Sequence, residues 1–190
     1  MKKKTLITLP NGKEVTLVLT HDDYNFFISA LDENRIKVGQ CKFNIEKLFR
    51  EQYTPGKFQH MVRLNVTRLD HYKATGNTYI RDTGEVFDYD KTITTLDSIN
   101  ILNEDYFKVG LGTAMCKEME KISRTYNSSV IEGFYNPNGK FAHGAEKFYK
   151  NNGFTFDKTS YPSLTVVRKT LQKLPHKTTT NVSDKSTPDM

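Results

Sequence analysis

Residues Ser98 to Gly112, which read SINILNEDYFKVGLG, decide the fold class of this 190-residue chain. The apolar alternation up to Leu102 predicts a short strand, and Gly110 and Gly112 mark a turn soon after it. Beyond the turn, apolar residues recur every three or four positions, which predicts an amphipathic helix. These apolar positions are Leu111, Ala114, Met115, Met119, Ile122 and Tyr126. We therefore expect a strand that passes through a glycine turn directly into a helix.

A second strand and a second helix follow in the same order. Residues 129–135 predict a strand, and the stretch FYKNNGF at residues 148–154 ends the second helix. Two last strands, at about residues 155–158 and 164–169, flank Tyr161-Pro162 and predict a hairpin. The second half of the chain is therefore expected to run β-α-β-α and to finish with a hairpin.

The first half of the chain is rich in expected strands. One β-hairpin is predicted over residues 6–19, and a second over residues 26–43. A short helix is expected from Glu46 to Tyr53, because Pro55-Gly56 would end it. Residues 61–66 are then expected to be extended.

Residues 67–96 are polar and rich in turn-forming residues, so we interpret them as a loop or an insertion with a hairpin around Asp82-Thr83-Gly84-Glu85. An alternative keeps the segment Arg63-Leu64-Asn65-Val66 as the start of the strand that precedes the glycine turn. A long insertion would then separate the two parts of that strand.

The turn Lys108-Val109-Gly110-Leu111-Gly112-Thr113 has the properties of an anion site. Glycines let the backbone approach a ligand closely, so several N–H groups converge on phosphate oxygens at the positive end of a helix. A P-loop would need Gly-Lys-Ser/Thr at its end, and a dinucleotide fingerprint would need a third glycine where position 115 is methionine. The alternative interpretation is a pair of glycines that only pack a strand against a helix.

Two motifs together resemble the GCN5-related N-acetyltransferase (GNAT) family. The cofactor loop of that family reads Gln/Arg-x-x-Gly-x-Gly/Ala, and residues 107–112 match it except at Phe107. Residues 149–154 match the Tyr-x-x-x-Gly-Phe end of the family's last helix. The resemblance implies a mixed α/β (α+β) fold, with a central mixed sheet of about six or seven strands flanked by helices. In the family, the fourth and fifth strands of this sheet splay apart. We expect a single domain over residues 1–172 and a disordered tail over residues 173–190.

The resemblance also implies acetyl-CoA as the co-substrate. Its pyrophosphate would bind the glycine turn, and its pantetheine arm would pair with the open edge of the fourth strand at Ile101 and Leu102. The thioester carbonyl would lie near the backbone N–H of Leu102. The expected cofactor-binding residues are Ile101, Leu102, Phe107, Lys108, Val109, Gly110, Leu111, Gly112 and Thr113. Phe107 and Ala142 depart from the family's usual residues, and Lys108 is a candidate for the missing positive charge.

Three residues are candidates for proton transfer. Tyr149 matches the family's usual proton donor to the departing thiolate, although a core aromatic residue is the alternative interpretation. Asp97 and Glu132, on the expected fourth and fifth strands, are candidates for the general base. Water relays are the alternative to both carboxylates, and a charged residue at a strand end is commonly just solvated. His143 is left out of the catalytic set.

Composition narrows the class of protein further. Of the net charge of +6, three charges are Lys2, Lys3 and Lys4 and one comes from the tail after Leu171, which leaves two for the body. A nucleic-acid-binding or protein-interaction module on a degenerate GNAT fold remains the alternative function. Cys41 and Cys116 suggest neither a disulfide framework nor a metal site, and no apolar run is long enough for a membrane span.

We therefore expect a cytoplasmic N-acetyltransferase with no metal and no membrane partner. It would transfer an acetyl group by direct attack of a small-molecule or protein amine in a ternary complex, and it would be compatible with a homodimer. The acceptor side would be formed by parts of residues 44–96, 136–143 and 160–163, and these segments do not identify the acceptor.

Overall fold

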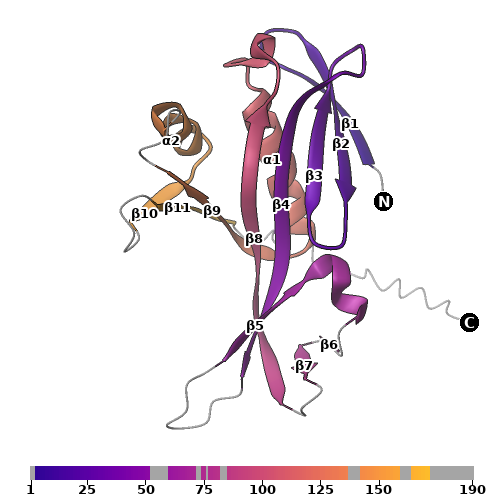
Figure 1. The fold of residues 1–190 in the computed structure, drawn as a ribbon, viewed down its shortest axis with the longest axis vertical. Helices are drawn as coiled ribbons and strands as arrows, with labels where there is room; N and C mark the ends of the chain where they lie inside the picture. Colours follow the sequence, from indigo (N-terminus) through magenta and orange to yellow (C-terminus); the bar gives the residue numbers. More distant parts are fainter. Residues whose placement is uncertain are drawn as a thin grey trace, which may run out of the picture.

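One mixed sheet organises the protein in the computed structural model (Figure 1). The structure describes residues 3–51, 60–71, 74–75, 77–81, 85–136, 142–158 and 164–171. Its strands are β1 (Lys3–Thr8), β2 (Glu14–His21), β3 (Phe26–Leu31), β4 (Lys37–Glu51), β5 (Met61–Asn65), β6 (Ala74–Thr75), β7 (Thr78–Ile80), β8 (Val86–Ile101), β9 (Ser128–Tyr135), β10 (Thr155–Lys158) and β11 (Thr165–Thr170). Its helices are α1 (Leu111–Thr125), α2 (Ala142–Asn151) and two short 3-10 turns, η1 (Val66–His71) and η2 (Glu104–Tyr106). No helix in these ranges is long and apolar enough to span a membrane.

The main path of the sheet runs in the order β1-β2-β3-β4-β8-β9-β11-β10. Strands β8 and β9 are parallel and α1 connects them, whereas the other pairs on this path are antiparallel. A parallel pair needs such a crossover connection, while the N-terminal strands follow one another as hairpins. Both predicted N-terminal hairpins, the β-α-β-α order and the mixed fold class are confirmed. The eleven strands of the described sheet exceed the six or seven that were expected.

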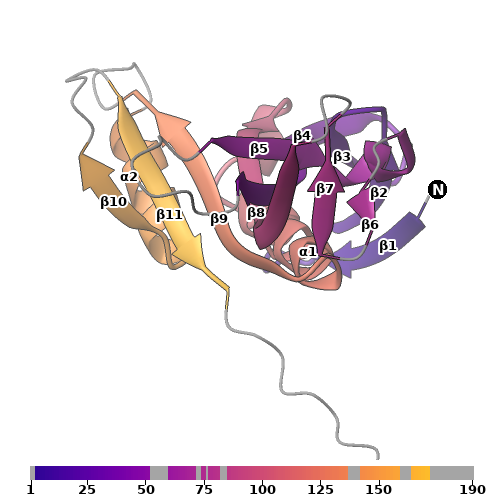
Figure 2. The same ribbon diagram turned by 90° about the horizontal axis from the view of Figure 1, so that it is seen from below.

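Both α-helices lie on one face of the sheet. The buried residues Met115 and Met119 of α1 belong to the main core together with Ile45 of β4 and Ile131 of β9. On β9, Tyr135 points to the same face as Ile131, because side chains alternate along a strand. The ring of Tyr149 in α2 lies 6.1 Å from the ring of Tyr135, so α2 lies on this face too. Figure 2 shows α1 beneath β4 and β8. The other face of the sheet is called the helix-free face below, with reference to the described α-helices.

Strands β8 and β9 diverge part of the way along their length. Their last paired residues are Leu96 and Gly133, whereas β8 continues alongside β4 as far as Ile101. Asp97 has no partner on β4, because Phe43 pairs with Leu96 and Lys42 pairs with Ser98. A bulge of this kind bends the strand that carries it. The predicted splay between the family's fourth and fifth strands is therefore present here between β8 and β9.

The predicted helix from Glu46 to Tyr53 is wrong as far as Glu51, where β4 ends, and the last two residues lie outside the described ranges. Strand β4 pairs with β5 on one side and with β8 on the other, so tertiary pairing overrides local preference. Leu48 and Phe49 are adjacent and both buried, because they point to opposite faces of the sheet and each belongs to a different apolar cluster.

The interpretation of residues 67–96 as a loop is also wrong over Val86 to Leu96, which belong to β8. Thr92 and Thr94 are buried, and the Thr94 hydroxyl lies within hydrogen-bonding distance of two serine hydroxyls, Ser123 Oγ at 2.9 Å and Ser128 Oγ at 3.1 Å. Because these core residues are polar, the sequence pattern did not indicate a buried strand here. The alternative start at Arg63 is wrong too, because β5 is a separate strand on the far side of β4. The hairpin that joins β7 to β8 is confirmed, although its turn at residues 82–84 lies outside the described ranges.

Strands β4 and β8 are longer than the other strands and extend past the rest of the main sheet at one end of the molecule (Figure 1). There they pair with β5 and β7, and Phe49, Leu64 and Phe87 form a small core of their own. The glycine turn lies at the opposite end of β8. Below, the part of the sheet around these three side chains is called the extension.

Candidate active site

The glycine turn ends in a helix start without a side-chain cap. Gly110 is the N-cap of α1 in a left-handed conformation (φ 89°, ψ 0°), and Lys108 is also left-handed (φ 59°). The carbonyl of Gly110 accepts the N–H of Ala114 at 2.9 Å, which begins the helix. The first N–H groups of a helix have no partner within it, so the amides of the first turn are available to an anion.

Each glycine of the turn also makes a close approach. A Cβ on Gly110 would lie 3.0 Å from Cδ of Pro10, and one on Gly112 would lie 3.1 Å from Cε2 of Phe148. Gly110 is thus required both by its positive φ and by the N-terminal hairpin, and Gly112 allows α2 to pack on the first turn of α1. The packing interpretation of the two glycines is therefore confirmed, and the anion-site interpretation stays a prediction.

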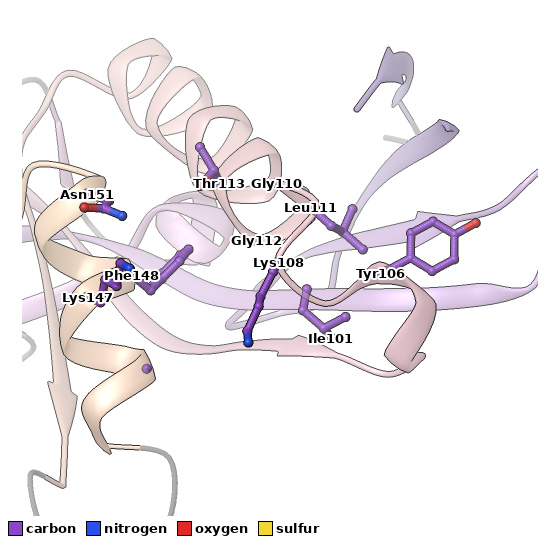
Figure 3. A pocket seen from close by; sticks show the side chains of 11 residues that line it. Ile101, Tyr106, Lys108, Gly110, Leu111, Gly112, Thr113, Lys147, Phe148 and Asn151 are labelled. Atoms are coloured by element: carbon purple, nitrogen blue, oxygen red, sulfur yellow. The ribbon is translucent and has the colours of Figure 1, made fainter. Parts of the chain in front are cut away.

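A cavity of about 490 Å³ lies between the first turn of α1, the end of β8 and α2 (Figure 3). Its volume is within the usual range for small-molecule sites. It is lined by Ile101, Tyr106, Lys108, Gly110, Leu111, Gly112, Thr113, Gly144, Lys147, Phe148 and Asn151. Lys108 and Lys147 are the charged side chains among these residues, so the charge of the described lining is positive.

Six of the expected cofactor-binding residues line this cavity: Ile101, Lys108, Gly110, Leu111, Gly112 and Thr113. The other three lie elsewhere among the described residues, with Val109 packed against the main core and Leu102 and Phe107 at least half exposed. Helix α2 contributes lining residues that were not predicted: Gly144, Lys147, Phe148 and Asn151. Their spacing of three and four residues along the helix is the signal that could have found them.

The predicted role of the Leu102 backbone N–H does not fit the strand pairing. This N–H donates to the carbonyl of Val38 on β4 at 2.9 Å, so it points away from the gap between β8 and β9. Backbone groups alternate in direction along a strand, and the amides of Ile101 and Ile99 therefore point toward the gap. Which backbone N–H groups of β8 face the gap became known only from the pairing of β8 with β4.

Tyr149 lies in an aromatic cluster on the helix-covered face. Its ring centroid is 5.3 Å from that of Phe148, 5.4 Å from that of Phe154 and 6.1 Å from that of Tyr135. Burial raises the pKa of Tyr149 to about 12. The hydroxyl is therefore protonated at neutral pH, as a proton donor must be. The ring packs among other aromatic rings, as the core-aromatic interpretation predicted.

The two candidate bases lie on the helix-free face, opposite Tyr149. Asp97 Oδ2 is 3.0 Å from Lys42 Nζ, and Glu132 Oε1 accepts a hydrogen bond from Arg168 Nε at 3.1 Å. Arg168 also donates to Asp157 Oδ2 at 2.8 Å. Both candidate carboxylates are thus held in ion pairs at the place where β8 and β9 separate.

A polar network joins α2 to the glycine turn. The side-chain amide of Asn152 donates to Thr113 Oγ1 at 3.3 Å and to the Phe148 carbonyl at 2.8 Å. Lys169 of β11 donates to the Asn152 carbonyl at 2.7 Å and pairs with Glu120 of α1. These contacts fix the walls of the cavity relative to one another. The side chains of Ala142 and His143 lie outside the described part of the chain.

No protein-family model matches the sequence, and no curated protein matches it. Solved structures do resemble the fold. The GNAT domain of PAT from S. lividans matches with a TM-score of 0.55 and 8% identity, over 88% of this chain and 97% of that one. NAA60 from Arabidopsis thaliana, in complex with a bisubstrate analogue, matches with a TM-score of 0.48 and 12% identity, over 80% of this chain and 78% of that one. The PaiA N-acetyltransferase from Thermoplasma acidophilum, in complex with coenzyme A, matches with a TM-score of 0.46 and 14% identity, over 78% of this chain and 62% of that one.

The chain therefore has the fold of the GNAT acetyltransferases. The match with the S. lividans domain spans nearly that whole domain and most of this chain. At 8% identity it defines the fold and leaves the chemistry to be argued from the residues of the site.

Proposed function

We propose that the protein is an acetyl-CoA-dependent N-acetyltransferase. One observation carries the proposal: a glycine turn at a helix start, two lysines and the open edge of a divergent strand border one cavity. Coenzyme A has a pyrophosphate, a 3′-phosphate and an extended amide-containing arm, and these groups correspond to the three parts of the cavity.

In the proposed complex, the amides of the first turn of α1 bind the pyrophosphate. Lys108 and Lys147 face the cavity from opposite walls and contribute charge-assisted hydrogen bonds to the phosphates. Lys108 thus replaces the charge that the family usually places at the position of Phe107. The pantetheine arm extends along β8 toward the gap, where the outward backbone groups of Ile99 and Ile101 pair with its amides.

The proposed reaction is direct attack of an amine on the thioester. As the C–N bond forms, the carbonyl oxygen gains negative charge, and an outward N–H of β8 stabilises it. The C–S bond then breaks, and Tyr149 gives its proton to the leaving thiolate. The amine loses its proton to Asp97, to Glu132 or to water, and the tyrosinate is reprotonated from solvent.

Turnover of acetyl-CoA tests this proposal. Purified protein would be incubated with acetyl-CoA and a panel of amines, and the free thiol of coenzyme A would be measured with a thiol reagent. We expect thiol release that depends on both substrates, with acetylated amine detected by mass spectrometry in equal amount. Binding of acetyl-CoA without acetylation of any amine would leave the site as a coenzyme A binding module and would contradict the enzymatic proposal.

A further inference from the structure

A row of polar side chains crosses four adjacent strands on the helix-free face. Asn44 of β4 pairs with Thr95 of β8, Thr95 pairs with Glu132 of β9, and Glu132 pairs with Arg168 of β11. Residues paired across strands point to the same face of a sheet. The sequence neighbours Ile45, Ile131 and Val167 belong to the main core on the other face, so these four side chains point away from α1.

The position of this polar row links it to the cavity. The next paired residues beyond Thr95 and Glu132 are Leu96 and Gly133, where the two strands separate. The row therefore borders the start of the gap from the helix-free face, and the cavity lies on the helix-covered face. A group bound to the row would approach the gap from the side opposite to the cavity.

Two oxygen atoms of the row accept no hydrogen bond within the part of the chain that the structure describes. Oδ1 of Asn44 is buried and has no hydrogen-bond partner among the described residues. A buried polar atom of this kind costs free energy unless a ligand satisfies it. The hydrogen bond from Arg168 engages Oε1 of Glu132, while Oε2 accepts none within the described residues, and this side chain keeps about a quarter of its surface exposed.

The charges around the row favour a cation. Three carboxylates, on Asp97, Glu132 and Asp157, are paired with two cations, Lys42 and Arg168. One negative charge is left over, and a single ammonium group would neutralise it. Phe134 is 53% exposed on the same face, one position beyond the last residue of β9 that pairs with β8. An exposed aromatic ring suits the alkyl stem or the charge of an amine.

We propose that Asn44, Thr95 and Glu132 form the acceptor subsite, and that its substrate class is a primary alkylammonium. An ammonium group has three N–H donors and no acceptor, which matches Asn44 Oδ1, the Thr95 hydroxyl and Glu132 Oε2. A neutral alcohol would leave the excess negative charge unpaired. The inference rests on the proposed transferase function and assigns its acceptor side.

The test uses the full chain saturated with coenzyme A and n-butylammonium as the probe. Binding would be followed by two-dimensional NMR of the side-chain amide of Asn44. We expect this signal to shift with n-butylammonium in a saturable way and to stay unchanged with n-butanol at equal concentration. Asn44→Leu should weaken n-butylammonium binding, read from neighbouring backbone amides, by about tenfold or more. The affinity of the Asn44→Leu variant for coenzyme A should equal that of the wild type.

Two further variants keep the test decisive. Asn34→Leu makes the same substitution in the exposed turn between β3 and β4 and should change neither affinity. Glu132→Gln keeps the size of the side chain and removes its charge, so it should also weaken n-butylammonium binding by about tenfold. The inference is overturned if coenzyme A binds but n-butylammonium does not shift the Asn44 amide, or if n-butanol shifts it equally. Failure of coenzyme A itself to bind would instead contradict the proposed function.

Discussion

At the scale of single residues, the proposed chemistry depends on Tyr149. Tyr149→Phe removes the hydroxyl and keeps the ring that packs on Phe148 and Phe154. We expect kcat to fall by about 100-fold or more, because a positioned proton donor contributes that much, while the affinity for acetyl-CoA stays unchanged. Steady-state kinetics and calorimetry would measure the two quantities. Tyr79→Phe, in the extension, is the matched control, and equal losses in both variants would remove Tyr149 from the mechanism.

Burial of Tyr149 has a consequence for stability at high pH. Its pKa rises from an ordinary value of 10.0 to about 12 in the folded protein, so folding favours the protonated form. The resulting stabilisation is fully present below about pH 10 and is lost as the pH rises toward 12. The free energy of unfolding, measured by urea denaturation, should therefore fall more steeply over this range in the wild type than in Tyr149→Phe. Identical slopes would show that the hydroxyl is solvated in the folded protein.

At the scale of elements, the glycine turn gives a matched pair of substitutions. Gly110 and Gly12 both have positive φ, but a Cβ at Gly110 would meet Pro10, whereas one at Gly12 has open space around it. Both changes to alanine should cost about 1–2 kcal/mol of stability, because an L-residue is strained in this conformation. Only Gly110→Ala should also displace the first-turn amides and weaken acetyl-CoA binding, by about tenfold.

Denaturation and calorimetry on the two variants would measure these effects. Equal acetyl-CoA affinities in Gly110→Ala and Gly12→Ala would contradict the placement of the pyrophosphate at the turn.

The elements that could be predicted from the sequence are those whose apolar pattern directly reports burial. Helix α1 and strand β9 have such patterns, and both were predicted within about one residue at their start. Strand β8 was missed before Ser98 because its core positions include Thr92 and Thr94, whose hydroxyls find partners only in the folded protein. Strand β4 was missed beyond Phe43 because the adjacent residues Leu48 and Phe49 are both buried, so its apolar residues stop alternating with polar ones.

The candidate site was predicted in the same uneven way. Its glycine turn is a local motif, so the sequence could reveal it. Lys147 and Asn151 reach the cavity only because α2 packs on Gly112. The amide that faces the gap could not be chosen before the pairing of β8 with β4 was known, and Leu102 was therefore assigned the wrong direction. Both failures concern long-range contacts, which local patterns do not encode.

At the scale of the whole molecule, β8 connects the extension to the cavity. Phe87 and Ile101 are fourteen residues apart on this strand, which corresponds to about 45 Å. Phe87 is fully buried with Phe49 and Leu64, so Phe87→Ala should lower the free energy of unfolding by about 3–5 kcal/mol. Acetyl-CoA affinity should change by less than about twofold, since distant sites act independently.

Urea denaturation and a coenzyme A titration of Phe87→Ala would test this separation. A large loss of affinity in a variant that is still folded would mean that the extension and the cavity are coupled through β8.

The central claim is that the cavity between α1, α2 and the end of β8 binds acetyl-CoA through its phosphates. Calorimetric titration of the wild type and of a Lys108→Ala, Lys147→Ala double variant with acetyl-CoA tests it most directly. We expect one site per chain in the wild type, weakened at least about tenfold in the double variant and weakened by added salt in the wild type. The absence of binding at millimolar acetyl-CoA, or equal affinity in the two proteins, would contradict the claim.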